Sequence, residues 1–112
     1  MSDRPAIKLM PDYECWPLWH HGGNQVGNID PRLSGVSGPL VDDLERWANV
    51  YDSHLNLSDP AFTNWTKEEE AQFDTEGRKL CLRLAAELRT RYSVFYFDPF
   101  TKSCVPAEVL VV

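Results

Sequence analysis

The three histidines and three cysteines are the side chains of this 112-residue sequence best suited to holding a metal ion. Structural zinc is usually bound by four ligands arranged as close pairs, such as C-x2-4-C or H-x3-5-H. His20 and His21 are adjacent and point apart on most backbones, while Cys15, Cys81 and Cys104 lie far apart in the chain. The sequence therefore predicts no metal site and no cofactor, and it favours a solvated loop end for the two adjacent histidines.

Other residues suited to ion binding or catalysis lack the pattern that such chemistry needs. Residues 28–30 resemble a fragment of a calcium loop but lack its ordered acids and its bidentate glutamate. Neither Cys15 nor Ser37 is surrounded by the signature of a nucleophilic enzyme. Asp52 and Asp59 could serve as an acid–base pair across a cleft, but nothing in the sequence sets their separation. We therefore predict no catalytic residue, and a protein that is not an enzyme.

Acidic and aromatic residues gather in one stretch of the chain. From Asp42 to Glu76 there are ten acids and two cations, Arg46 and Lys67, a balance of −8. Aromatic residues are enriched at protein interfaces, so acid beside aromatic indicates a docking surface for a basic partner. About half of these acids also suit the starts of helices, where a solvated helix face explains them. The predicted partner-binding residues are Asp42, Asp43, Asp52, Asp59, Trp65, Glu68, Glu69, Asp74 and Glu76.

Two helices are expected to position this surface. From Leu40 to Leu55 apolar residues recur every three or four positions, and Ser37-Gly38-Pro39 is a typical helix start. A second helix begins with the capping-box sequence of Thr66 to Glu69 and carries an apolar stripe that ends at Leu88. Acids fill its first half and cations its second, as the helix dipole favours.

The rest of the chain predicts a small sheet. We expect strands at residues 6–10 and 93–97, and a further strand from Val105 and the tail 109–112. Residues 12–21 form a second extended piece, which Pro17 confines to an edge or a bend. Residues 22–38 read as a long loop, and residues 1–5 as a frayed terminus. The predicted fold is a single α+β domain over residues 1–112, in the order β-loop-α-α-β-β, with two antiparallel helices packed on the sheet.

Composition excludes several classes of partner and location. The formal charge of −6 disfavours direct binding to nucleic acid or to an anionic membrane surface. No apolar run approaches the roughly 18 residues that span a bilayer, and the first residues lack the apolar core of a signal peptide. An odd number of widely spaced cysteines favours reduced thiols. We therefore expect a cytoplasmic protein of bacterial type.

Several motifs resemble those of a group of small bacterial cytosolic proteins, some of which are similar to immunity proteins of toxin–immunity systems. The resemblance covers about residues 7–98 and names no reaction, so it implies no catalytic residue. It is carried by residues 10–19 (MPDYECWPLW), 27–31 (GNIDP), Trp47-Ala48, Tyr51-Asp52, Leu55-Asn56, Asp59-Pro60, Glu76-Gly77-Arg78 and Leu80.

Two hypotheses of function follow from the residues and the resemblance together. The first is an immunity protein, a monomer or weak dimer, that neutralises a toxin domain through the acidic and aromatic surface. A basic nuclease is the expected toxin, because acidic side chains speed encounter with a basic partner. The alternative is a small enzyme or a ligand- or metal-binding domain that uses the loop from His20 to Asp30, with Cys15 and Tyr13 in the same pocket.

Overall fold

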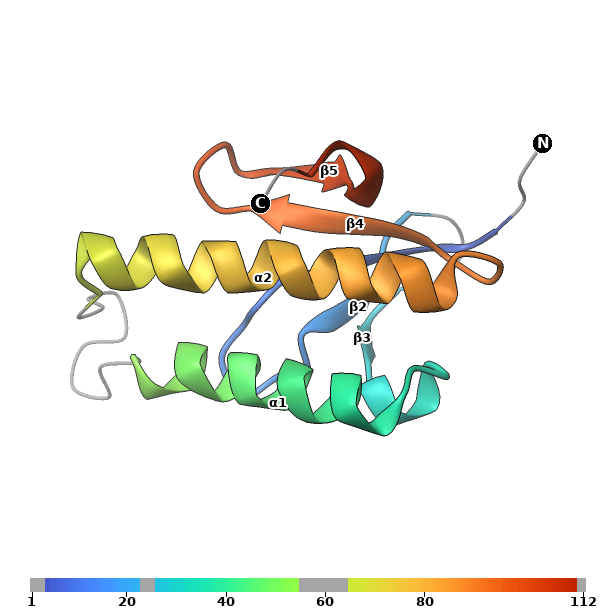
Figure 1. The fold of residues 1–112 in the computed structure, drawn as a ribbon, viewed down its shortest axis with the longest axis horizontal. Helices are drawn as coiled ribbons and strands as arrows, with labels where there is room; N and C mark the ends of the chain where they lie inside the picture. The colour runs from blue at the N-terminus through green and yellow to red at the C-terminus, as the bar shows by residue number, and fades with distance from the viewer. Residues whose placement is uncertain (1–3, 23–25, 55–64, 111–112) are drawn as a thin grey trace.

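A five-stranded mixed sheet and two long helices make up the fold in the computed structural model, which describes residues 4–22, 26–54 and 65–110 (Figure 1). The helices run in opposite directions beside the sheet (Figure 1). This arrangement confirms the predicted α+β class. The elements are β1 (Ala6–Leu9), β2 (Leu18–His20), β3 (Asn28–Ile29), the 3-10 helix η1 (Pro31–Leu33), α1 (Gly38–Ser53), α2 (Lys67–Leu88), β4 (Ser93–Asp98), β5 (Ser103–Pro106) and the 3-10 helix η2 (Ala107–Val109).

The strand order is β3-β2-β1-β4-β5, so the first strand lies at the centre. β1 and β4 pair in parallel, with Ile7 opposite Val94 and Leu9 opposite Tyr96. The other neighbours are antiparallel. A parallel pair needs a long crossover between its strands, and here that crossover contains the helix pair.

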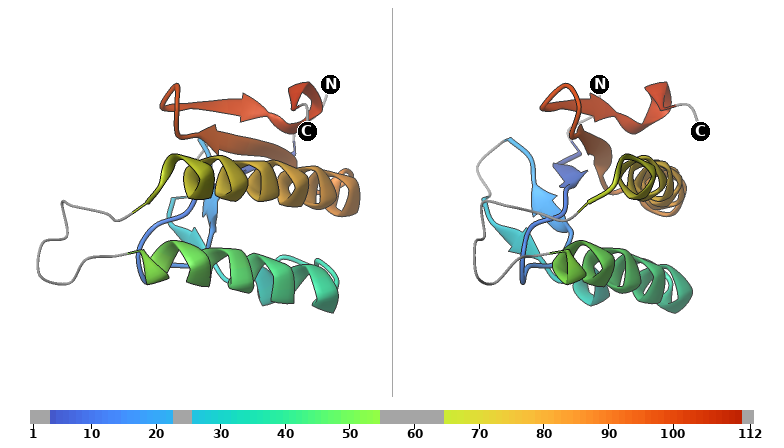
Figure 2. Two further views of the ribbon diagram at one scale, coloured as in Figure 1. Left: turned by 60° about the vertical axis from the view of Figure 1, so that its left-hand side comes forward. Right: turned by 90° about the vertical axis from the view of Figure 1, so that its left-hand side faces the viewer.

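One face of the sheet is buried against the helices. Burial alternates along β1 and β4, because successive side chains of a strand point to opposite faces. Figure 2 shows both helices on the same side of the sheet. The core is therefore a two-layer sandwich of sheet and helix pair. Its buried side chains include Ile7, Leu9, Leu18, Leu40, Leu44, Trp47, Leu80, Cys81, Leu84, Leu88, Val94 and Tyr96.

Both helices begin where the sequence predicts. Thr66 Oγ1 accepts from the Glu69 N–H at 3.1 Å, and Glu69 Oε1 accepts from the Thr66 N–H at 2.9 Å, which completes the capping box. At the start of α1, Glu87 of α2 accepts hydrogen bonds from the N–H and hydroxyl of Ser37. Gly77 lets α2 approach its neighbours closely, because a Cβ there would lie 2.6 Å from Trp47 Cζ2. At Gly77 the buried side of α2 therefore has room for a hydrogen atom but not for a side chain.

Three details differ from the expectation. The segment expected to be a loop, residues 22–38, contains β3 and η1. β2 begins just after Pro17 and lies inside the sheet rather than at its edge, since the proline precedes the paired residues. The last strand is Ser103–Pro106, whereas Val109 belongs to η2 and residues 111–112 lie outside the described ranges. The apolar, valine-rich composition of the tail predicts a strand, but Val109 lies in a 3-10 helix.

Candidate functional site

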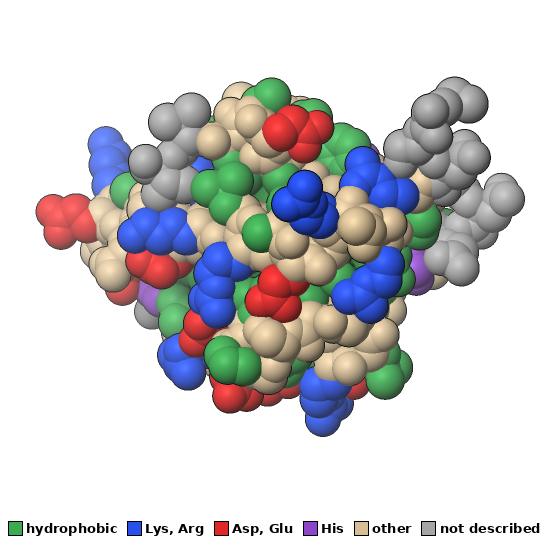
Figure 3. All heavy atoms as spheres, turned by 45° about the vertical axis from the view of Figure 1, so that its right-hand side comes forward, with side chains coloured by type: hydrophobic (Ala, Val, Ile, Leu, Met, Phe, Trp, Pro, Cys, Tyr) green, Lys and Arg blue, Asp and Glu red, His purple; other side chains and the backbone are tan. Residues whose placement is uncertain are grey.

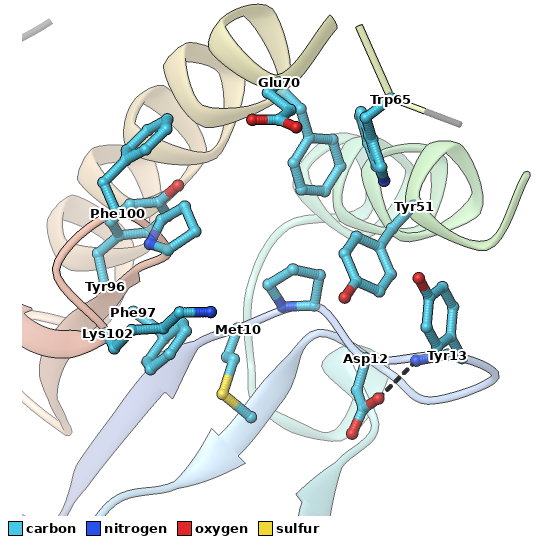
Figure 4. A pocket seen from close by; sticks show the side chains of 13 residues that line it. Met10, Asp12, Tyr13, Tyr51, Trp65, Glu70, Tyr96, Phe97, Phe100 and Lys102 are labelled. Carbon is cyan, nitrogen blue, oxygen red and sulfur yellow. Dashed lines mark hydrogen bonds between the residues drawn. The ribbon is translucent and has the colours of Figure 1, made fainter. Parts of the chain in front are cut away.

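A pocket of about 510 Å³ lies where α1 ends, α2 begins and the β4–β5 turn comes close (Figure 4). Four segments that are distant in sequence build it: the chain after β1, the end of α1, the start of α2 and the turn after β4. Its volume falls within the usual range of ligand pockets. It is lined by Met10, Pro11, Asp12, Tyr13, Tyr51, Trp65, Glu70, Phe73, Tyr96, Phe97, Pro99, Phe100 and Lys102.

One wall of the pocket is a connected group of aromatic rings. Tyr13 stacks on Tyr51 with 4.7 Å between ring centroids, and Trp65 meets Phe73 edge to face at 5.1 Å. Phe73 also stacks on Trp47 of α1 at 4.3 Å, with the ring planes 6° apart. Trp47 in turn donates from Nε1 to the Phe73 carbonyl at 3.0 Å. Because each ring is held by another, this wall presents preformed aromatic surface.

The opposite wall is the turn between β4 and β5. Asp98 shapes this turn, since its Oδ1 accepts from the N–H groups of Phe100 and Thr101. Phe100 is 63% exposed, and Lys102 has a left-handed backbone with φ of 59°. The turn therefore places an apolar ring and a cation at the pocket rim (Figure 4).

A hydrogen-bonded network lies behind the pocket and links α2 to β4. The Tyr96 hydroxyl donates to Asp74 Oδ1 at 2.6 Å, and Arg78 donates to Asp74 at 2.9 Å and to Asp98 at 3.2 Å. Burial and the Asp74 carboxylate raise the pKa of Tyr96 well above its usual value. Burial by itself would raise the pKa of Asp98, but the turn N–H groups and Arg78 outweigh it and lower that pKa. This network holds Tyr96, which lines the pocket, against α2.

The edge of the aromatic wall is held by His54, at the end of α1. Its ring stacks on Trp65 with centroids 3.7 Å apart, and its Nε2 lies 3.1 Å from Glu69 Oε2. Burial of the ring opposes protonation, yet the Val50 carbonyl and the Glu69 carboxylate outweigh it and raise the pKa of His54. The pKa of Glu69 is lowered, first by the Thr66 N–H and then by His54. Trp65 is therefore packed between helices and not free in solvent.

Carboxylates surround the aromatic wall, and we call Asp12, Glu14, Asp52 and Glu70 the acidic rim. Asp12 and Glu70 line the pocket, while Asp52 Oδ1 accepts from the Glu14 N–H at 3.0 Å and holds that loop against α1. Burial, with contributions from Tyr13, Asp12 and Asp52, raises the pKa of Tyr51 to about 12. No arginine or lysine forms an ion pair with the rim among the described residues.

A second set of acids forms ion pairs with arginines of the same chain, and we call Asp43, Asp74 and Asp98 the ion-paired acids. Asp43 bridges Arg46 on its own helix at 2.6 Å and Arg83 on α2 at 2.5 Å. Asp74 and Asp98 share Arg78. These carboxylates tie elements together, so their charge is largely compensated.

The structure separates the predicted partner-binding residues into different surroundings. Trp65 lines the pocket, and Asp52 lies next to the lining residue Tyr51 and accepts from the Glu14 N–H. Asp43 and Asp74 are ion-paired acids, and Glu69 completes the capping box. The remaining four differ again. Glu76 is exposed and lies 3.9 Å from Lys79, Asp42 and Glu68 are exposed, and Asp59 lies outside the described residues.

The pocket also contains residues that the sequence did not single out as binding residues. The end of β4 and the turn after it contribute Phe97, Pro99, Phe100 and Lys102. The chain just after β1 contributes Met10 and Pro11. The sequence Asp98-Pro99 marks the turn that carries Phe100, but no local pattern shows that this turn reaches the helix ends. The site is thus a product of tertiary packing.

The described residues of the loop proposed for an alternative function, 20–22 and 26–30, do not line this pocket. In it, Asn28 Nδ2 donates to the carbonyls of Trp16 and Leu18, and Asp30 pairs with Arg32 at 2.7 Å. The ring of His21 lies against Phe95. These side chains have structural partners, whereas Tyr13 of the same hypothesis belongs to the aromatic wall.

The described ranges are residues 4–22, 26–54 and 65–110. Within these ranges no three His, Cys, Asp or Glu side chains come together in a way that could hold a metal ion. Neither helix there combines the length and the apolar character that crossing a membrane requires. Cys81 is fully buried, and burial raises its pKa to about 12, which leaves it an unreactive core side chain.

The two ends of the helix pair differ in charge. The pocket end carries the acidic rim together with Glu68 and Glu69, whereas Arg89 and Arg91 follow the end of α2 at the opposite end. Figure 3 turns the latter end toward the viewer and shows Lys and Arg side chains spread over it, with acids between them. The pocket end therefore gathers several carboxylates, and Lys67 and Lys102 lie there as well.

Comparison with known families gives a match over most of the chain. The family model described as Serratia CdiI immunity protein-like matches residues 5–99. That range includes most of the pocket lining, from Met10 to Pro99, and leaves out Phe100 and Lys102. No curated protein matches the chain.

Proposed function

The chain belongs to the Serratia CdiI immunity protein-like family, and from this premise we propose that it binds and neutralises the toxin domain of a contact-dependent growth inhibition system. The observation that supports a binding surface is the preformed aromatic pocket bordered by the acidic rim. Aromatic surface supplies contact area at low entropic cost, and unpaired carboxylates supply attraction to a basic partner. An inhibitor needs these two properties and no catalytic group.

The toxin that best fits this surface is a basic domain. Among toxin classes we favour a nuclease, because nucleases bind phosphates through basic side chains. A nuclease holds phosphates with Lys and Arg, so its substrate groove attracts carboxylates as well. Asp52, Trp65, Glu68 and Glu69, together with Asp12 and Glu70, lie at the pocket end and would contact that groove. Inhibition would then follow from exclusion of nucleic acid, with the immunity protein itself binding none. The complex forms in the cytoplasm, and this chain is a monomer or a weak dimer.

The direct test is to identify the cognate toxin domain by pull-down from the native cell and to measure protection from it. Inducible expression of that domain should stop growth, and coexpression of this chain should restore it. In purified form the two proteins should form a complex whose affinity falls as salt rises, because the attraction is between exposed charges. Absence of both protection and complex formation would sink the proposal.

A pair of double variants tests which end of the molecule binds. Glu68→Lys with Glu70→Lys reverses two exposed acids at the pocket end, and Asp42→Lys with Glu108→Lys reverses two exposed acids elsewhere. Both pairs change the net charge equally, so general repulsion from a basic toxin is matched. We expect the first pair to abolish protection and the second to retain it. Equal loss in both would mean that the toxin responds to net charge and not to the pocket end.

A further inference from the structure

We propose that the aromatic pocket receives one arginine side chain of the toxin, which acts as the anchor of the complex. This rests on the proposed function and adds to it the place and the chemistry of the central contact. The pocket's volume of about 510 Å³ has room for a whole side chain, and the pocket lies between the aromatic wall and the β4–β5 turn. Interface anchors characteristically fill such desolvated pockets.

The aromatic wall fits a guanidinium group. Faces of Tyr and Trp rings attract cations, and arginine also stacks on them because it is planar. The molecule already contains this interaction beside the pocket, since Arg78 lies 5.3 Å from the centre of the Tyr96 ring, and Tyr96 is a lining residue. A second guanidinium could use the rings of Tyr51, Trp65 and Phe73 in the same manner.

The charges that line the pocket favour a cation over an anion. Glu70 and Asp12 contribute two carboxylates and Lys102 one ammonium group, and Asp52 adds negative charge next to the lining residue Tyr51. Figure 4 shows Glu70 and Lys102 on opposite sides of the pocket, so an entering side chain would pass between them. An arginine fork can pair with a carboxylate through two N–H groups, which a lysine cannot do.

A variant without Lys102 reveals whether the side chain that occupies the pocket is positively or negatively charged. If the occupant is an arginine, Lys102 repels it, and removing Lys102 strengthens binding. If the occupant is an acidic side chain or a chain terminus, Lys102 holds it, and removing Lys102 weakens binding. Glu70 should respond in the opposite direction in each case, so the two variants together give one unambiguous result.

The experiment measures association and dissociation rates of the toxin domain with four single variants. Glu70→Gln should weaken binding about 10-fold or more, mainly through faster dissociation, because a contact in the bound complex is lost. Lys102→Gln should strengthen it by about 2- to 5-fold. Glu108→Gln and Lys79→Gln make the same charge changes away from the pocket and should alter mainly the association rate. Thermal unfolding of each variant confirms that the fold is intact.

A double-mutant cycle identifies the anchor itself. Each arginine of the toxin is changed to glutamine and tested against this chain with and without Glu70→Gln. One toxin variant should lose affinity strongly against the original chain and about 10-fold less against Glu70→Gln. That coupling would establish an arginine in the pocket.

The outcomes separate this inference from the proposed function. If the unmodified chain binds and protects but Glu70→Gln behaves like Glu108→Gln, the anchor is elsewhere and the immunity function stands. If Lys102→Gln weakens binding, the pocket receives an anion and the inference is wrong. If native mass spectrometry shows a small molecule that occupies the purified protein and blocks the toxin, the pocket is a ligand site instead. If the unmodified chain does not bind the toxin, the proposed function and the anchor fall together.

Discussion

The ion-paired acids and the acidic rim are built from the same residue types but have different surroundings. Asp43, Asp74 and Asp98 each contact an arginine and join α1, α2 and β4. In the rim, Asp52 accepts from a backbone N–H and Glu70 borders a pocket. An acid that is paired inside the molecule contributes to the fold, whereas an acid beside an open aromatic wall is available to a partner. The number of acids in a segment therefore does not show which of them can bind a partner until the cations that pair with them are known.

The largest effect on folding should come from removing the cation of the ion-paired acids. Arg78 is 22% exposed in its side chain, and its partners Asp74 and Asp98 are 13% and 14% exposed. Arg78→Met leaves both carboxylates without their cation, so we expect the free energy of unfolding to fall by about 1–3 kcal/mol. Urea denaturation at neutral pH measures it. Lys79→Met, the adjacent exposed cation, is the control and should change stability by less than about 0.5 kcal/mol; equal effects would show that Arg78 is an ordinary surface charge.

Close packing behind the pocket gives the next effect. A Cβ on Gly77 would lie 2.6 Å from Trp47 and 3.0 Å from Tyr96, both of which are buried. A contact this short should cost the upper part of the usual overpacking range, about 2–3 kcal/mol, while replacing a helix glycine by alanine gains about 1 kcal/mol, so Gly77→Ala should lose about 1–2 kcal/mol. Gly38→Ala is the matched control, since a Cβ there meets nothing within 4 Å. A Gly77→Ala protein as stable as its parent would mean that this packing adjusts freely and does not hold the aromatic wall.

Local patterns predicted those parts of the fold that depend on neighbours in sequence. The capping box of Thr66 and Glu69, the start of α1 after Ser37 and the β-prone run from Ser93 each involve residues a few positions apart. Such signals act through backbone hydrogen bonds and side-chain periodicity, which a sequence displays directly. The α+β class and the succession of a first strand, two helices and a β-prone strand after them followed from these signals.

The site could be predicted only in part, because its geometry depends on contacts between distant residues. Asp43 and its partner Arg83 are 40 positions apart, and no periodicity links them. Likewise the turn that carries Phe100 and Lys102 faces the helix ends only because β4 lies beside β1. Trp65 and Asp52 are both predicted binding residues; Trp65 lines the pocket, and Asp52 follows the lining residue Tyr51 near the end of α1.

A binding measurement should sharpen the contrast between the two sets of acids. Asp43→Asn removes a carboxylate that already faces Arg46 and Arg83, so its loss exposes two arginines on one face. We expect the affinity for the toxin domain to change by no more than about threefold. Under the same conditions Glu70→Gln should have the larger effect. If Asp43→Asn weakens binding as much as Glu70→Gln, then pairing inside the molecule does not distinguish structural acids from binding acids.

The smallest effect concerns pH and the edge of the aromatic wall. Hydrogen bonds to Val50 and Glu69 raise the pKa of His54 above its ordinary 6.5 despite burial, so folding favours the protonated ring. The resulting stabilisation is fully present below about pH 6.5 and is lost as pH rises through the higher pKa of the folded state. The melting temperature of the protein minus that of His54→Gln should therefore decrease between about pH 5.5 and 8.5. Glu69 stays ionised over this range because its pKa lies below 4.5. A difference that grows with pH would mean that burial against Trp65, and not the Glu69 contact, governs His54.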